Sequence, residues 1–513
     1  MTILCTVDNF GITFDEPCYF KATYLHTKWI DCLKNSFLHH NYFHPFSSSV
    51  ISTYWEPFHN HPSFTFFISN FFWNFYHNSL GDIKSYRLSG AFFFALLISS
   101  VFMFASKIYG IKSGIISSLS LLLLPRVFGD SYLLALDIPI TCMWFLTIYA
   151  FYKSFNFLLW KIIAGILFGF ALATKINAFL IPIPLFIWTL IYYRKRKYLV
   201  NNFLWFGIIG FIVFIISWPW LWHQTFFRLT EYLLFHKSHF YVSTYYFGKA
   251  YTVPPWHYPF VMTLITIPIS ILLFILIGLF QKNKSTSQIK NLFILNFLIP
   301  FLISAYPKIP KYDGVRLFMS VFPFMTIFAG IGFNFFIEKL ELFFKFINKT
   351  KLWVISTIVF LIINIFFLMQ IHPYERSYYN FLIGGTKGAY KKGMEITYWN
   401  EPLTSKPMIE FINSLKGNQI NILVHGGSPY PLILLQHANL LKKNIKFISN
   451  SSNESFLNEK KEWDYFLLNC RFGFFNDNDW QIFKKKKPIF SVKCQKVPLA
   501  LLYTKEEVKD LLK

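Results

Sequence analysis

The sequence predicts an α-helical polytopic membrane bundle with a small α/β domain at its C-terminal end. Of 513 residues, 54% are hydrophobic and only 14% are charged, whereas roughly a quarter of the residues in soluble domains are charged. A single soluble core at this length could not bury so much apolar surface, but a bilayer can. The second observation is a series of apolar runs, several of which approach the roughly 20 residues that a membrane crossing needs.

These runs predict about ten transmembrane helices between residues 86 and 371. They lie at 86–109, 113–125, 132–152, 157–174, 177–193, 200–222, 258–281, 291–306, 316–337 and 352–371. The connections alternate between Lys- and Arg-rich segments, such as 194–197, and segments rich in Trp, Tyr, His and Pro. The positive-inside rule assigns the basic set to the cytoplasm. With an even number of spans, residues 1–85 and 372–513 both face outward, to the periplasm, the cell exterior or the ER lumen.

The two end regions differ in character. Residues 1–85 are predicted to form an outward loop in which 62–76 is an interfacial helix. Because a long first outward loop usually follows a span, a missing N-terminal span is an open hypothesis. Residues 372–513 alternate helix-like and strand-like segments, which is typical of an α/β domain: a helix at 407–417 and strands at 420–427, 463–470 and 500–504.

Two features invite a nucleotide or nucleic-acid interpretation. The net charge is +24, but the basic residues are scattered between apolar runs and do not gather on one soluble face, which argues against a nucleic-acid partner. His425, Gly426 and Gly427 follow a predicted strand without the spacing of a nucleotide-binding fingerprint. An ordinary strand-to-helix turn is therefore favoured there over a phosphate loop.

Ionisable residues at the outward ends of the apolar runs are the candidate functional groups. They are Asp15, Glu16, His61, Asp137, Lys175, Asp313 and Arg316. Such groups at membrane depth are functional when they face a cavity. Structural interpretations remain open: the acidic pair precedes a proline and suits a helix N-terminus, and the two cations could be snorkelling anchors. Taken together, the set predicts a site for an anionic, lipid-linked substrate, with cations for a phosphate and a carboxylate as general base.

In order along the chain, these motifs resemble the GT-C glycosyltransferases. The similarity is to family 39, which includes protein O-mannosyltransferases and the aminoarabinose transferase of lipid A. The matching features are the acidic pair, His61 with Pro62, Asp137, Thr174 with Lys175, and the run 312–316 that leads into 318–332. Segments 254–268 and 372–390 are similar to a bacterial branch. The resemblance covers residues 10–400, and the chain departs from the family in having no helix directly before the acidic pair.

The resemblance implies transfer of a sugar from a polyprenyl-phosphate carrier to an acceptor hydroxyl or phosphate on a protein, lipid or polysaccharide. It implies a multi-pass protein of the cell (inner) membrane, or of the ER membrane in a eukaryote, acting with inversion on the outward side. Asp15 would be the general base, with Glu16 beside it in the same catalytic pair, orienting or binding the substrate. Lys175 and Arg316 would hold the donor phosphate. Asp137, His61 and Asp313 would shape the site, and a divalent metal is a possible cofactor.

Two other function classes stay open at this point. A transporter or lipid flippase would show internal repeats and helices broken near the bilayer midplane, and no repeat is evident in the sequence. An outward-facing scaffold or sensor, with the bundle as its anchor, would leave Asp15, Asp137 and Lys175 without a role.

Overall fold

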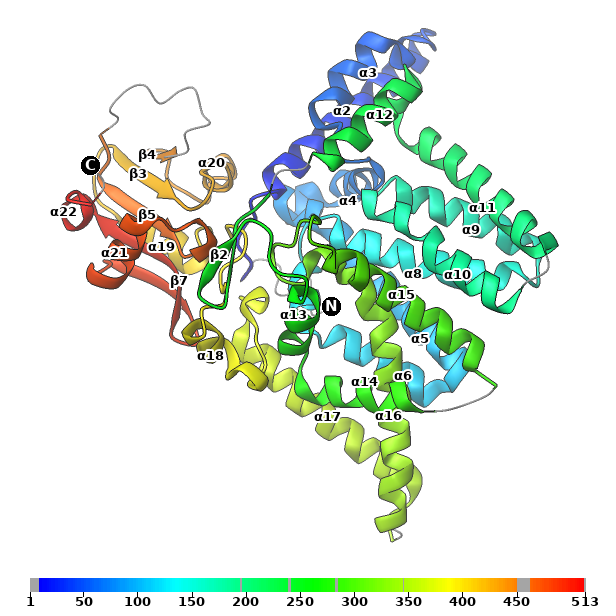
Figure 1. Ribbon diagram of the computed structural model, residues 1–513. Coiled ribbons are helices and arrows are strands. Elements are labelled where there is room, and N and C mark those ends of the chain that lie inside the picture. The colour runs from blue at the N-terminus through cyan, green and yellow to red at the C-terminus, as the bar shows by residue number, and fades with distance from the viewer. Residues whose placement is uncertain are drawn as a thin grey trace.

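The computed structural model places a helical bundle beside a mixed α/β domain (Figure 1), which confirms the predicted fold class. It describes residues 9–193, 196–238, 241–281, 285–344, 346–449 and 462–511, without the side chains of 196–199. The first helices are α2 (Glu16–Leu38), α3 (Ser48–Trp55), α4 (Phe64–Leu80), α5 (Asp82–Tyr109), α6 (Ile111–Leu122), α7 (Pro125–Asp130), α8 (Asp137–Ser154), α9 (Leu158–Leu172) and α10 (Pro182–Tyr192). They continue with α11 (Arg196–Ser217), α12 (Thr225–Lys237), α13 (Tyr258–Thr266), α14 (Ile269–Phe280), α15 (Ser287–Ala305), α16 (Phe322–Phe343) and α17 (Lys349–Ile371).

The chain is a multi-pass membrane protein. In the described residues, five helices are long and apolar enough to cross a membrane: Asp82–Tyr109, Val200–Ser217, Ser287–Ala305, Arg316–Phe343 and Lys349–Ile371. Each of the other predicted spans also coincides with helix, although α6, α9 and the segment Ile176–Tyr192 are shorter than a straight crossing needs. The total of about ten spans therefore stays a prediction.

The predicted span 258–281 is not one straight helix. It is divided into α13 and α14, which are bent by 117° relative to each other. Pro268 lies at the break, and a proline both lacks the N–H for a helical hydrogen bond and disfavours helix at the residue before it. Beyond the bend, α14 packs closely on α16. A Cβ at Gly278 would lie 2.0 Å from the Phe328 carbonyl oxygen, so small residues set this close helix approach.

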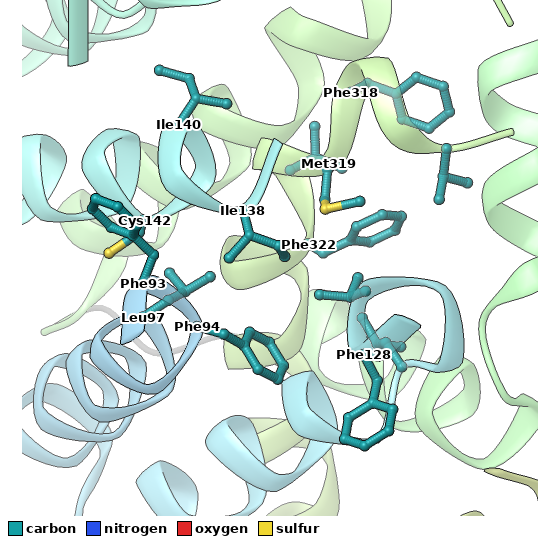
Figure 2. Packing of buried hydrophobic residues seen from close by; sticks show 14 of the residues in the cluster. Phe93, Phe94, Leu97, Phe128, Ile138, Ile140, Cys142, Phe318, Met319 and Phe322 are labelled. Carbon is teal, nitrogen blue, oxygen red and sulfur yellow. The ribbon is translucent and has the colours of Figure 1, made fainter. Parts of the chain in front are cut away.

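A continuous apolar core lies between the helices of the bundle (Figure 2). Side chains of α5, α7, α8 and the Arg316–Phe343 segment meet there, and Phe94, Ile138 and Phe322 are almost completely buried. Ile138 directly follows Asp137, and Phe318 lies two residues after Arg316. The packed core therefore fixes the backbone that presents these two charged residues.

The α/β domain is a five-stranded sheet with helices against it. The strands are β3 (Ile420–His425), β4 (Ile445–Ser449), β5 (Tyr465–Asn469), β6 (Phe490–Cys494) and β7 (Val497–Thr504), in the order β4-β3-β5-β7-β6. The pairs β3–β4 and β3–β5 are parallel, and β5–β7 and β6–β7 are antiparallel. The helices of this region are α18 (Gly385–Lys391), α19 (Lys406–Ser414), α20 (Tyr430–His437), α21 (Asp477–Lys485) and α22 (Lys505–Val508), and a hairpin pairs β1 (Thr244–Tyr246) with β2 (Lys249–Tyr251).

Polar contacts join the domain to the bundle. Arg376 donates to Asp130 of α7 through Nε at 2.6 Å and to Glu401 through Nη1 at 2.8 Å. The segment before α2 is held too, because the backbone of Ile12 exchanges two hydrogen bonds with the Thr404 hydroxyl. These buried contacts fix the position of the α/β domain against the bundle.

Candidate active site

A single guanidinium lies at the centre of the predicted site. Arg316 donates from Nη2 to Asp15 at 2.8 Å, from Nε to Asp137 at 2.8 Å and from Nη1 to Asp313 at 3.1 Å. These four residues come from three distant parts of the sequence. The structure thus brings together charged residues that the sequence could only place on the same side of the membrane.

Two more cations complete the cluster. Lys175 donates to the second oxygen of Asp137 at 2.6 Å, and Arg471 donates from Nη2 to the second oxygen of Asp313 at 2.8 Å. Three carboxylates therefore face three cations, and each buried charge has an opposite charge within hydrogen-bond distance.

The charged side chains stand where helices begin. Asp15 directly precedes α2, which has Pro17 in its first turn, and Asp137 is the first residue of α8. Carboxylates are favoured at helix N-termini. Asp313 and Gly314 both adopt left-handed backbone angles, with φ of +54° and +68°. A Cβ at Gly314 would lie 2.1 Å from Nη1 of Arg126, so the turn that presents Asp313 has no room for a side chain there.

Trp399 covers the guanidinium of Arg316. The ring centroid lies 3.8 Å from Arg316 Cζ and 4.7 Å from Arg376 Cζ, distances at which an aromatic ring stabilises a cation. The sequence-based site contained neither Trp399 nor Arg471. No local pattern marks Trp399, but Arg471 follows a predicted strand, and the carboxyl ends of strands in α/β sheets are where ligands bind.

A large cavity opens beside the cluster, with a volume of about 1040 Å³. Of the predicted site residues, Asp15, His61, Lys175, Asp313 and Arg316 line it. The bundle side is largely apolar and includes Phe58, Phe179, Phe235, Ile303 and Leu317. The side formed by the α/β domain is largely polar and includes Asn400, His425, Gly426, Gly427, Ser449 and Arg471.

Within the cluster, Asp15 is the most accessible carboxylate. Its side chain is 25% exposed, against 2% for Asp137 and 5% for Asp313. Burial raises the pKa of Asp15 above its ordinary value, and the charge of Arg316 opposes that increase. Loss of the Arg316 contact would therefore make Asp15 a stronger base.

Glu16 points away from this cluster. Its carboxylate is fully buried, accepts from Nε and Nη2 of Arg87, both at 2.7 Å, and accepts from the Thr13 backbone N–H at 3.0 Å. This bidentate buried pair, between residues 71 positions apart, holds the start of α2 against α5. Of the predicted acidic pair, Asp15 lines the cavity and Glu16 has the contacts of a structural residue.

His61 lies in the cavity wall, next to other rings. Its ring packs edge-on to Tyr19 at 5.7 Å and lies 6.1 Å from the His236 ring. This position suits the predicted role of shaping the site, which remains a prediction.

One group of described residues has ligand atoms close enough together for a metal ion. Glu56, His59 and Glu231 each offer one such atom, all within 4.8 Å of one another, and imidazole with carboxylate is a typical zinc donor set. However, Glu56 already accepts from Trp220 Nε1 at 2.7 Å and lies 3.7 Å from Arg228. A metal on Asp137 would have to compete with Lys175 and Arg316, so neither place requires one.

Residues 60–223, about a third of the chain, match the family model described as dolichyl-phosphate-mannose-protein mannosyltransferase. No curated protein sequence matches. The crystal structure of ArnT from Cupriavidus metallidurans in the apo state aligns over 99% of this chain and 96% of that chain, with a TM-score of 0.51 and 11% identity. The chain has the GT-C fold. The resemblance that the sequence predicted is confirmed at this level.

A second structure of the Cupriavidus metallidurans protein, bound to undecaprenyl phosphate, aligns over 86% of this chain and 88% of that chain. Its TM-score is 0.48 and its identity is 12%. The family match contains His61, Asp137 and Lys175, whereas Asp15 and Arg316 lie outside it.

Proposed function

We propose that this protein transfers a sugar from a polyprenyl-phosphate carrier to an acceptor hydroxyl or phosphate on the outward side of the membrane. The observation that carries the proposal is the convergence of Asp15, Lys175 and Arg316 on one cavity in a GT-C fold. The description of the matching family names a sugar on a polyprenyl phosphate, dolichyl-phosphate mannose. The apolar wall on the bundle side suits the first isoprene units of such a carrier.

Lys175 and Arg316 would hold the donor phosphate. The Lys175 ammonium has three N–H donors and, within the described part of the chain, one hydrogen bond, to Asp137. It therefore has donors to spare for a phosphate. Each of the three nitrogens of Arg316 donates one hydrogen bond to a carboxylate, which uses three of its five N–H donors. A phosphate that binds this guanidinium through two nitrogens would therefore displace one of the carboxylates.

Asp15 is the carboxylate that the phosphate would displace, because it is the most exposed of the three. The exchange couples donor binding to catalysis. When the phosphate takes the place of Asp15 on Arg316, the Asp15 carboxylate is released to accept the proton of the incoming acceptor. Loss of the contact with Arg316 also makes the Asp15 carboxylate more basic, because that contact lowers the pKa of Asp15.

The chemical step is a single displacement. The acceptor oxygen forms a bond to the anomeric carbon of the sugar while the bond from that carbon to the phosphate oxygen breaks. The acceptor proton goes to Asp15, and the electron pair of the broken bond goes to the phosphate, whose charge Lys175 and Arg316 stabilise. One displacement inverts the anomeric configuration, by the logic that applies to inverting glycosidases.

An assay on membranes or proteoliposomes tests this function. Radiolabelled polyprenyl-phosphate sugars are supplied, and release of labelled sugar from the carrier is measured for the wild type, Asp15→Asn and Lys175→Ala. Asp31→Asn and Lys28→Ala are matched controls, because these residues form an exposed pair on α2 at 3.8 Å. Turnover that is lost in Asp15→Asn and kept in Asp31→Asn supports the proposal. Equal turnover in Asp15→Asn removes Asp15 from the mechanism, and no turnover with any carrier favours a transporter.

A further inference from the structure

The polar wall of the cavity is built by one edge of the α/β sheet. His425 ends β3, Ser449 ends β4, and Arg471 lies two residues after the end of β5. All three line the cavity, together with the Gly426–Gly427 turn. Because β4, β3 and β5 are parallel neighbours, their carboxyl ends meet at one edge, and that edge is where open α/β sheets bind ligands.

Arg471 is the charged residue of this edge. Its side chain is 7% exposed, and its Nε has no hydrogen-bond partner among the described residues. A buried N–H without a partner is costly, and here it belongs to a guanidinium in the wall of a cavity. The Arg471 Cζ also lies 4.5 Å from the ring centroid of Phe474, another cavity residue. The guanidinium is held in place while part of its donor capacity is unused.

His425 is held in a similar way. Its Nε2 lies 2.9 Å from Oδ1 of Asp479, a residue of α21 that is completely buried. The other carboxylate oxygen of Asp479 accepts the Asn476 N–H in a capping box, which fixes the carboxylate. Among the described residues Oδ1 makes no hydrogen bond, so its contact with His425 is that of an ion pair. An imidazole oriented by a buried carboxylate keeps its second ring nitrogen for another partner.

We propose that this edge of the sheet is the acceptor subsite, and that it takes a polar acceptor carrying an anionic group, a phosphate or a carboxylate. Arg471 binds the anionic group, and His425 and the Gly426–Gly427 turn contact the polar body of the acceptor. This inference rests on the proposed function, and it assigns to the α/β domain the part of the substrate that the membrane bundle does not bind.

The division of the cavity supports an acceptor here and not the donor. The apolar residues that suit a lipid chain come from the bundle, next to Lys175 and Arg316, whereas the domain supplies polar groups. The two guanidinium groups are connected, because Asp313 accepts from Arg471 with one oxygen and from Arg316 with the other. An anion on Arg471 would thus lie beside the donor phosphate, with the acceptor hydroxyl directed toward Asp15.

Binding to the full-length protein in detergent tests the subsite without knowledge of the natural acceptor. The probes are glucose 1-phosphate, glucuronic acid, uncharged methyl glucoside and undecaprenyl phosphate, each titrated by calorimetry. The variants are Arg471→Gln, Arg471→Lys and His425→Gln. The matched controls are Lys446→Gln on the exposed face of β4 and His437→Gln at the exposed end of α20. A melting temperature for each variant shows that it is folded.

We expect both anionic probes to bind more tightly than methyl glucoside. Arg471→Gln should weaken the anionic probes by about tenfold or more, which is the effect of losing a hydrogen bond to a charged group. Arg471→Lys should keep part of that affinity, and undecaprenyl phosphate should bind Arg471→Gln within about twofold of the wild type. Both controls should leave all four affinities unchanged.

Three results would overturn the inference. In the first, Arg471→Gln binds the anionic probes as well as the wild type does. In the second, undecaprenyl phosphate loses as much affinity as the anionic probes, or competes with them, which would place Arg471 in the donor site. In the third, the wild type binds anionic sugars but no undecaprenyl phosphate, and then the proposed function fails while the anion site stands without an acceptor role.

Discussion

Two arginines meet the same indole ring in this protein, yet their surroundings differ. Arg316 and Arg376 both lie over Trp399, and their side chains are almost equally exposed, at 11% and 10%. The carboxylates around Arg376, from Asp130 and Glu401, are 5% and 8% exposed. Around Arg316, Asp15 is 25% exposed and lines the large cavity.

This contrast indicates that an ionic contact can serve as a binding site when one of its partners can be exchanged for a ligand. The contacts of Arg376 join the bundle to the α/β domain, and no substrate could replace them without opening that junction. At Arg316, one of three carboxylates can be replaced while the other two keep the guanidinium in place.

The largest effect should come from Asp15→Asn. Loss of a general base reduces kcat by about 10²–10⁴-fold. Affinity for undecaprenyl phosphate should stay equal or increase, because the competing carboxylate on Arg316 is now neutral. Single-turnover kinetics and equilibrium binding on the same preparation measure both quantities. A parallel loss of carrier affinity would contradict the exchange and would make Asp15 a binding residue.

Arg376→Gln should affect stability and leave the site able to work. It leaves Asp130 and Glu401 buried without their cation, and breaking a buried pair costs about 3–5 kcal/mol. Thermal denaturation in detergent should show a clear fall in melting temperature, with turnover per folded molecule near that of the wild type. Lys406→Gln, which removes an exposed contact to Glu410, is the control. An unchanged melting temperature with lost turnover would place Arg376 in the active site.

Much of this contrast could not be read from the sequence. The acidic pair was predicted as one catalytic unit, but neighbouring residues at the start of a helix point in different directions. Asp15 therefore reaches Arg316, and Glu16 reaches Arg87. The partners lie 301 and 71 positions away, and such separations leave no local pattern. The sequence does predict where these residues lie relative to the membrane, because ionisable residues at the ends of apolar runs can be recognised without knowing which residues they contact.

The α/β domain shows the same limit in its strands. Strands β3, β5 and β7 lie inside the sheet and are apolar along their length, so they could be predicted. The missed strands, β4 and β6, are the two edges, and each has an exposed lysine, Lys446 or Lys493. Lysine on an edge strand prevents pairing with other chains, and it also interrupts the apolar pattern by which a strand is recognised.

A smaller effect, on stability, is expected from a change of pH, through the buried carboxylate of Glu395. Burial raises the pKa of Glu395 from 4.5 to about 7, although its carboxylate accepts the backbone N–H groups of Phe472, Gly473 and Tyr245. The unfolded chain then loses this proton near pH 4.5 and the folded chain near pH 7. Between these values the folded state binds more protons, so stability should fall as the pH rises and level off above pH 7.

The pH effect is at most about 3–4 kcal/mol, from 1.36 kcal/mol for each unit of pKa difference. Melting temperatures of the wild type and Glu395→Gln from pH 4.5 to 8 measure it. The wild type should lose stability across this window relative to Glu395→Gln, which does not titrate. Parallel curves for the two proteins would show that Glu395 is ionised throughout.

The smallest effect should come from substitutions in the exposed ion pair on α2, which serve as the reference for charges that do not line the cavity. Lys28 and Asp31 have side chains 48% and 47% exposed and approach to 3.8 Å. Solvent screens such a pair, so Lys28→Ala or Asp31→Asn should change the free energy of unfolding by less than about 1 kcal/mol. Turnover should be unchanged in both variants. If either variant lost activity to the extent of Asp15→Asn, charge anywhere on α2 would matter, and access to the cavity would no longer explain why Asp15 is the reactive carboxylate.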